Sequence, residues 1–186
     1  VTGATGLLGG HLARALLAAG TEVRAFVRPT SDLRALRALP LEIVTGDGDD
    51  ADALRRAVAG MDQVFHAAGH VSLSSPFEAE GGDPRYRQVN VALTERLLAA
   101  SLEAGVKRFV YASSHSVYAL DAPLPTSEDA PLRPISDYGR SKLAAEELIR
   151  AYQARGLNST VVRPCIFYGP GDRYFLPAAL RLVRLP

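Results

Sequence analysis

Short apolar runs alternate with longer amphipathic segments along this chain, and that alternation restricts the folds open to it. The short runs are rich in β-branched and aromatic residues and are typical of strands: 22–28, 42–45, 63–67, 108–113 and 159–163. Four segments between them place apolar residues at helical spacing: 7–19, 50–59, 86–104 and 138–155. Strands that alternate with helices form right-handed βαβ units, whose strands run parallel. We therefore predict an α/β fold, a doubly wound parallel sheet with helices on both faces.

Charge and composition exclude several classes of partner. The 186 residues include 21 basic and 20 acidic side chains, so the net charge of +1 favours neither nucleic acid nor an anionic membrane as a partner. No apolar run approaches the ~20 residues that span a bilayer. Cys165 is the only cysteine, which excludes an intrachain disulfide and argues against a cysteine-based metal site. We expect a cytoplasmic protein that acts on a small molecule and holds no metal.

Residues 2–10 (TGATGLLGG), which we call the glycine turn, lie between a short strand remnant and the first predicted helix. Gly3 allows a tight turn, Gly6 lets the backbone approach a pyrophosphate, and Gly9 lets the helix pack closely on the strand. The helix N-terminus then offers free N–H groups to the anion. The spacing G-x-x-G-x-x-G differs from G-x-G-x-x-G, and an ordinary turn is the alternative. Its position between strand and helix favours a dinucleotide site.

The ends of the next two predicted strands bear on the choice of dinucleotide. A site for NAD would place an acidic residue about 20 residues after the glycines, to bind the ribose 2′-hydroxyl. Arg28 stands near that position, where it could bind the 2′-phosphate of NADP, although a solvated surface arginine is the alternative. We therefore favour NADP over NAD. Asp47, followed by Gly48, could accept a hydrogen bond from the adenine amino group, or form a plain turn.

Tyr138 and Lys142 lie four residues apart in a predicted helix and so share one face. A free tyrosine has a pKa near 10, and a neighbouring ammonium and a positively charged nicotinamide would both favour the phenolate. Of the 21 basic residues only Lys107 and Lys142 are lysines. Ser114 follows the fourth predicted strand at the same sheet edge and could orient a substrate oxygen towards Tyr138. A surface Tyr–Lys pair and a serine-rich turn are the alternatives.

Taken in order, these motifs resemble the extended short-chain dehydrogenase/reductase superfamily, the NAD(P)-dependent epimerase/dehydratase family, over essentially the whole chain. The resemblance rests on residues 1–9 (VTGATGLLG), 46–47 (GD), 64–68 (VFHAA), 89–91 (VNV) with Thr94, 111–114 (YASS) with 117–118 (VY), 138–142 (YGRSK), 163–164 (RP) and 168–172 (YGPGD). Three positions depart from the family pattern. Gly48 replaces a bulky aliphatic residue, Ala119 replaces glycine, and 115–116 (HS) replace the Asp-Glu pair of nucleotide-sugar 4,6-dehydratases, which argues against that dehydration.

The resemblance implies a Rossmann-type enzyme that transfers hydride at a secondary alcohol or ketone. It assigns Tyr138 as acid/base, Lys142 as its electrostatic and ribose-binding partner, and Ser114 as the hydroxyl that orients the substrate. It places the cofactor at Gly3, Gly6, Leu7, Leu8, Gly9, Arg28, Asp47, Gly48, Ala67, Ala68, Tyr138, Lys142 and Pro164. The substrate would be a nucleotide sugar or a reductase-type carbonyl compound. A non-catalytic, dinucleotide-sensing or RNA-binding relative is the alternative, although such relatives typically lack the Tyr–Lys pair.

We expect residues 1–172 to form the NAD(P)-binding domain and 173–186 to begin a C-terminal substrate-binding region. The chain reaches the glycine turn by residue 3, so we expect a fragment that lacks most of the first strand and most of the substrate region. The long segments 70–84 and 119–135 follow strands at the ligand-binding edge and are expected to wall the pocket. By the same resemblance, helices such as 86–104 and 138–155 could pair two copies into a homodimer.

Overall fold

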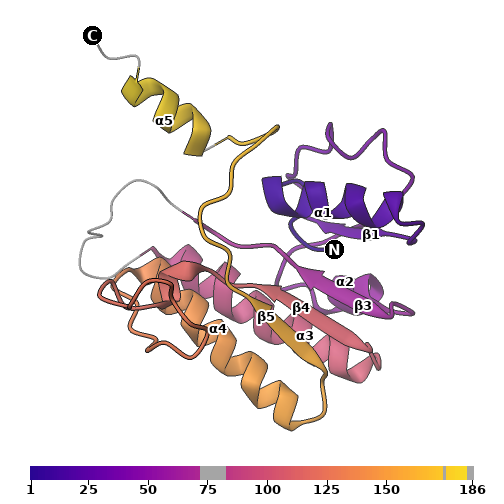
Figure 1. Cartoon of the computed structure of the whole chain (residues 1–186). Coiled ribbons are helices and arrows are strands. Elements are labelled where there is room, and N and C mark those ends of the chain that lie inside the picture. The colour runs from indigo at the N-terminus through magenta and orange to yellow at the C-terminus, as the bar shows by residue number, and fades with distance from the viewer. Residues whose placement is uncertain (72–82, 174, 184–186) are drawn as a thin grey trace.

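The computed structural model describes residues 1–71, 83–173 and 175–183, and its strands form a parallel sheet (Figure 1). The strands of these residues are β1 (Arg24–Val27), β2 (Glu42–Thr45), β3 (Gln63–His66), β4 (Arg108–Ala112) and β5 (Ser159–Val162). β1 pairs with β2, β3 with β4, and β4 with β5. Thr2 joins the two groups because it pairs in parallel with both Phe26 of β1 and His66 of β3. The order across the sheet is therefore β2-β1-Thr2-β3-β4-β5.

The four predicted helices are present, one of them with a difference in kind, and α5 and η2 are additional. The helices are α1 (Leu7–Ala18), α2 (Ala51–Val58), α3 (Leu93–Glu103), α4 (Asp137–Ala154) and α5 (Phe175–Val183), with a π-helix η1 (Tyr86–Ala92) and a 3₁₀ turn η2 (His115–Val117). The predicted helix 86–104 thus begins as a π-helix, a form that recurs at functional sites. α1 and α3 are followed by Gly20 and Gly105 at φ +78° and +69°, the left-handed conformation that ends many helices.

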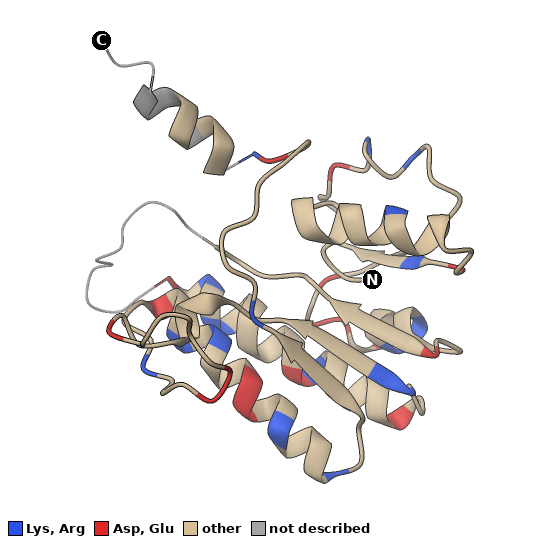
Figure 2. Ribbon diagram, in the orientation of Figure 1, with Lys and Arg blue, Asp and Glu red and all other residues tan. Residues whose placement is uncertain are grey.

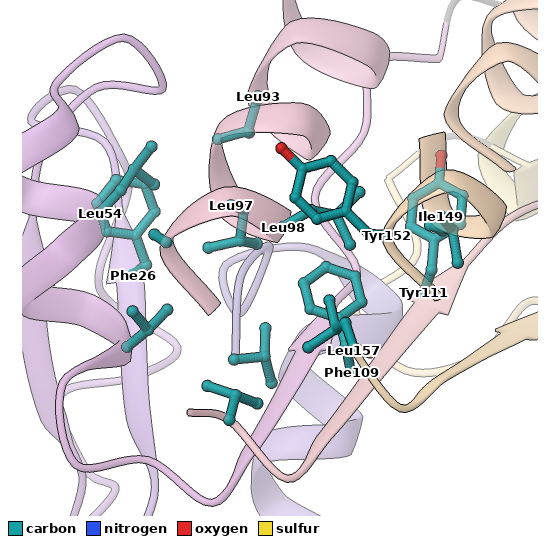
Figure 3. Packing of buried hydrophobic residues seen from close by; sticks show 14 of the residues in the cluster. Phe26, Leu54, Leu93, Leu97, Leu98, Phe109, Tyr111, Ile149, Tyr152 and Leu157 are labelled. Atoms are coloured by element: carbon teal, nitrogen blue, oxygen red, sulfur yellow. The ribbon is translucent and has the colours of Figure 1, made fainter. Parts of the chain in front are cut away.

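Helices cover both faces of the sheet, as predicted, and the alternation of side chains along β1 separates the two cores. Phe26 packs into a cluster with residues of α2, α3 and α4 (Figure 3), whereas Ala25 and Val27 pack with Leu36 on the face of α1. Prominent in the larger cluster are Leu54, Leu97, Phe109, Ile149 and Tyr152. Burial of each large apolar side chain contributes about 1.5–3 kcal/mol. This apolar packing fixes the relative positions of the strand ends that carry the candidate site.

A buried histidine ties Thr2 to the helix that follows β3. His66 Nδ1 lies 2.7 Å from Thr2 Oγ1, and its Nε2 lies 2.8 Å from Thr94 Oγ1. Thr94 donates its own proton to the carbonyl of Asn90, so His66 Nε2 donates to Thr94 and Nδ1 accepts from Thr2. Both nitrogens of the neutral ring are therefore satisfied. Burial, together with the charge of Lys142, lowers the pKa of His66 to about 3.

This histidine makes the protein less stable as the pH falls from 6.5 towards 3. The unfolded chain binds a proton on His66 near pH 6.5, whereas the folded protein does not until about pH 3. The free energy of unfolding should then drop by about 1.4 kcal/mol per pH unit, or about 2 kcal/mol between pH 6.5 and 5. Urea unfolding at both pH values measures it. His66→Gln should flatten this slope and His115→Gln, at an exposed position, should keep it; equal slopes in all three proteins would contradict the assignment.

Candidate cofactor and proton-transfer site

Two glycines let the glycine turn pack directly between the sheet and α1. Gly3 has a φ of +71°, and a Cβ added there would lie 2.7 Å from the backbone of Ala67 and Ala68, just after β3. A Cβ on Gly9 would lie 2.5 Å from the carbonyl carbon of Gly3. Both distances are shorter than real Cβ atoms tolerate, so neither position accepts a side chain without movement. The turn therefore presents bare backbone at the carboxyl edge of the sheet.

The start of α1 fits the pyrophosphate of a dinucleotide. The N–H groups of Leu7, Leu8 and Gly9 lie in the first helical turn and have no acceptor within the helix. That turn contains no acidic residue, and no part of the α1 ribbon carries the red of Asp and Glu in Figure 2. The N-terminus of a helix carries a partial positive charge of about half an electron charge. Anion binding here would thus be unopposed by a carboxylate of the helix itself.

The residues proposed for the adenosine end lie beside the glycine turn. Thr2 pairs with Phe26, so Arg28, two residues further along, lies at the same edge as the turn. Arg28 is exposed, and within the described residues its guanidinium has no hydrogen bond or ion pair, which leaves it available to a phosphate. Asp47 is exposed after β2. A Cβ on Gly48 would lie 3.3 Å from Leu93 Cδ1, so Leu93 fills the space that a larger residue at 48 would need.

Lys142 is buried and reaches the backbone next to the glycine turn. It is only 4% exposed, and its Nζ donates to the carbonyl of Ala112 over 2.8 Å. A Cβ on Gly69 would lie 3.2 Å from that Nζ, and Gly69 directly follows the Ala67–Ala68 backbone on which Gly3 packs. The ammonium and the glycine turn are therefore neighbours across residues 67–69. Burial lowers the pKa of Lys142 to about 8, so the side chain remains mostly charged at neutral pH.

Tyr138 lies in the first turn of α4, where the helix begins against the segment that carries Ser114. The Ser136 hydroxyl caps this helix by accepting from Gly139 N–H over 3.0 Å. A Cβ on Gly139 would lie 2.8 Å from Pro134 Cβ and 3.2 Å from the Ser116 carbonyl carbon. Glycine at 139 therefore allows the close approach that brings Tyr138 to Ser114.

The pKa of Tyr138 differs from the sequence-based expectation. Burial raises it above its ordinary value, while the interaction with the Ser114 hydroxyl acts in the opposite direction. Lys142 Nζ lies 6.0 Å from the centre of the Tyr138 ring, and its one hydrogen bond within the described residues goes to Ala112. In the protein alone, the loss of hydration outweighs the interaction with Ser114. A phenol that is neutral at rest suits a group that first donates a proton to a carbonyl oxygen.

Ser114 and Pro164 meet at the ends of β4 and β5. Ser114 is half-buried and caps η2, its hydroxyl accepting from Ser116 N–H over 3.1 Å. His115 N–H donates to the carbonyl of Pro164 over 2.9 Å, which brings the end of β5 beside Ser114. The predicted residues thus form one row along the carboxyl edge of the sheet. Arg28 and Asp47 lie past β1 and β2, and Ser114 and Pro164 lie past β4 and β5.

The sequence as a whole matches the model of the NAD dependent epimerase/dehydratase family over residues 1–185. The chain belongs to this family. It is 38% identical over 175 residues to Sterol demethylase protein B of Methylococcus capsulatus, covering 92% of this chain and 52% of that protein. It is 35% identical to 4-hydroxy-2-methyl-3-oxo-4-farnesyl-3,4-dihydroquinoline-1-oxide ketoreductase of Stigmatella aurantiaca, covering 99% of this chain and 54% of that one. The chain spans about half the length of these relatives.

Solved structures of the family show the same fold. MoeE5 in complex with UDP-glucose and NAD is 39% identical, with a TM-score of 0.74, and the match covers 92% of this chain and 55% of MoeE5. The resemblance inferred from the glycine turn, the Tyr–Lys pair and the other ordered motifs is therefore confirmed, as is the Rossmann-type fold. No helix among the described residues is long and apolar enough to span a membrane.

Two buried polar residues of this family member were not singled out from the sequence. Asn90 of η1 accepts from His70 N–H over 2.7 Å and donates to Ser141 Oγ over 2.9 Å, which ties the segment after β3 to α4. Glu146 is 1% exposed and pairs with Arg163. The available signals were the VNV motif around Asn90 and the four-residue spacing between Lys142 and Glu146. Neither signal reveals a partner that is distant in sequence.

Some expectations remain predictions. Most of segment 70–84 falls on residues 72–82, outside the described residues, so its role as a pocket wall is not tested. Within segment 119–135, Ala130 packs with Val117 and Tyr118 near Leu143 of α4. This places the segment against α4 without testing its contact with a ligand. The domain boundary at residue 172 and the homodimer also stay predictions.

Proposed function

We propose that this chain is the cofactor-binding and proton-transfer part of an NAD(P)-dependent epimerase or reductase that acts at a secondary alcohol or ketone. The observation that carries the proposal is the position of the Lys142 ammonium. It is buried between the Gly69 backbone, next to the glycine turn, and the face of α4 that bears Tyr138. When bound, the dinucleotide supplies or accepts the hydride at its nicotinamide ring.

Residues of this chain would bind the cofactor, orient the substrate and transfer the proton. Leu7, Leu8 and Gly9 would bind the pyrophosphate through their N–H groups, and Ala67 and Ala68 would line the cofactor trough. Lys142 has three donors, one of them used by Ala112, so two are left for ribose hydroxyls. Ser114 would hold the substrate oxygen. Tyr138 would donate its proton to that oxygen in reduction and remove it in oxidation.

We also propose that NADP is bound in preference to NAD, because Arg28 is exposed with an unengaged guanidinium. Arg28→Ala should weaken NADP⁺ binding about 10-fold, the loss of one charge-assisted hydrogen bond, and leave NAD⁺ binding unchanged. Titration calorimetry with both nucleotides measures this. Arg37→Ala, at an exposed position further along the same segment, is the matched control and should bind NADP⁺ as the wild type does. Equal losses for both nucleotides, or none, would contradict the preference.

The substrate class we propose is a nucleotide sugar or a reductase-type carbonyl compound. The similarity to MoeE5, a structure with UDP-glucose and NAD, supports the first, and the similarity to a ketoreductase supports the second. An epimerase returns the hydride and consumes no net cofactor, whereas a reductase oxidises one NADPH per product. Cofactor consumption with a panel of nucleotide sugars and ketones tests the proposal. Binding of the dinucleotide with no turnover of any member by the wild type would favour a non-catalytic relative instead.

A further inference from the structure

Glu146 lies on α4 one turn after Lys142, and its carboxylate is held by three donors. Arg163 donates through Nε to Oε1 over 3.0 Å and through Nη2 to Oε2 over 2.7 Å, a bidentate contact. Ser113 Oγ donates to Oε1 over 2.5 Å. The Glu146 side chain is 2% exposed, whereas Arg150 approaches it from the surface at 3.6 Å. The carboxylate is therefore fixed in place and removed from water.

The Glu146 carboxylate and the Lys142 ammonium form hydrogen bonds with consecutive residues at the end of β4. Lys142 Nζ donates to the carbonyl of Ala112, and the next residue, Ser113, donates to Glu146. Residues four apart on a helix share one face, so both side chains reach from the same face of α4 to the end of β4. Arg163 continues away from this pair, donating to Tyr118 Oη over 2.7 Å and to the Glu128 carbonyl over 2.9 Å.

The other groups that face Lys142 carry no negative charge at neutral pH. From β4 the Tyr111 ring lies 4.7 Å from Nζ, and from α4 the Tyr138 ring lies 6.0 Å away. Burial raises the pKa of both phenols, so both are neutral. From β3 His66 is also neutral, because burial lowers its pKa to about 3. Among the described residues, Glu146 is the acidic side chain that acts on Lys142, with Arg163 on its other side.

The buried ion pair between Glu146 and Arg163 is weak evidence for a role in stability. Apolar residues of similar volume often stabilise a protein as well or better. We propose that Glu146 is a positioning residue for proton transfer: its fixed carboxylate holds Lys142 charged and in place beside Tyr138, while Arg163 and Ser113 hold the carboxylate. This inference rests on the proposed function. Burial alone lowers the pKa of Lys142, and Glu146 opposes that effect.

The titration of Lys142 tests this directly, since the chain contains only two lysines. Protein labelled with ¹³C at lysine Cε should give two signals in NMR. Lys107 is exposed and paired with Asp62, so it should titrate above its ordinary range and serve as the internal reference. Lys142 should titrate near pH 8 in the wild type. Glu146→Gln keeps the shape of the side chain and should move the Lys142 midpoint down by about 1 unit or more.

The control is Glu147→Gln, which makes the same charge change at the next, exposed residue of α4 and should leave the Lys142 midpoint where it is. If Glu146→Gln does not fold, Glu146→Gln combined with Arg163→Gln removes both charges of the pair and should still lower the midpoint. An unmoved midpoint, or a rise towards 10.5 as water enters, would overturn the proposal in either variant. In an active protein, the basic limb of the kcat pH profile should move down with the midpoint.

The same measurements separate this inference from the proposed function. Suppose that Glu146→Gln lowers the Lys142 midpoint but the wild-type protein transfers no hydride to any tested substrate. That result would contradict the proposed function alone. If the wild-type protein is active but Glu146→Gln leaves the Lys142 midpoint unchanged, the positioning role alone is contradicted. Neither result depends on the other, because the NMR titration is made without cofactor or substrate.

Discussion

Tyr138→Phe should lower kcat by about 10²–10⁴-fold, the usual contribution of a positioned acid or base. The substitution removes only the hydroxyl, so the ring can keep its contact with Tyr86, whose centre lies 6.1 Å away. Ser114 loses its partner on the phenol, and the substrate oxygen loses its proton donor. Dinucleotide affinity should change little, because the N–H groups of α1 and the Lys142 ammonium remain. Steady-state kinetics and titration calorimetry measure the two quantities separately.

Tyr152→Phe supplies the matched control for this loss. Tyr152 lies further along α4, buried in the larger core cluster and stacked on Arg155 at 4.3 Å. Tyr152→Phe also deletes a phenol hydroxyl from α4, but far from the carboxyl ends of β4 and β5. We therefore expect kcat to stay within about twofold of wild type. A Tyr138→Phe protein that turns over as fast as Tyr152→Phe would remove Tyr138 from the chemistry.

Gly3→Ala should both destabilise the protein and weaken dinucleotide binding. The added methyl would meet the backbone of Ala67 and Ala68 at 2.7 Å, and backbone atoms cannot rotate aside as a flexible side chain can. Overpacking of this kind costs about 1–3 kcal/mol, and the left-handed φ of +71° adds about 1–2 kcal/mol. Moving the turn away from β3 would also disturb the trough in which the cofactor would lie. Urea unfolding gives the first effect and nucleotide titration the second.

Gly20→Ala separates the clash from the backbone conformation. Gly20 has a similar φ of +78°, but no atom lies within 4 Å of a Cβ built there. Gly20→Ala should therefore lower the free energy of unfolding only by the cost of the left-handed conformation, about 1–2 kcal/mol. It should bind nucleotide as the wild type does. A Gly3→Ala protein no worse than Gly20→Ala in stability and binding would show that the close packing of the glycine turn on residues 67–68 is unimportant.

What could be predicted from the sequence is what local patterns encode. The glycine spacing located the turn, apolar periodicity located the helices and strands, and the four-residue spacing put Tyr138 and Lys142 on one helical face. Element ends differ by one or two residues, as for β1, predicted as 22–28 and found as Arg24–Val27. Such ends depend on which residues find a partner strand, and no single segment contains that information.

The rest depends on contacts between residues distant in sequence. His66 is neutral because it is buried between Thr2 and Thr94, and the pKa of Tyr138 rises because burial outweighs the hydrogen bond with Ser114. Glu146 meets Arg163 only once α4 has packed against the ends of β4 and β5. These environments set protonation states, and protonation states decide what the site can do. A sequence pattern identifies the residue types but does not show which of them are buried away from water.

Hydride and proton should be transferred to one carbon and its oxygen beside Tyr138, and isotope transfer measures this. Reduced dinucleotide carrying deuterium at the nicotinamide C4 would be mixed with the carbonyl substrate that the panel identifies, and the product examined by mass spectrometry and NMR. We expect deuterium on the carbinol carbon with wild-type protein, and its near absence with Tyr138→Phe although the cofactor still binds. Equal labelling by both proteins, or bound cofactor with no labelled product from any substrate, would contradict it.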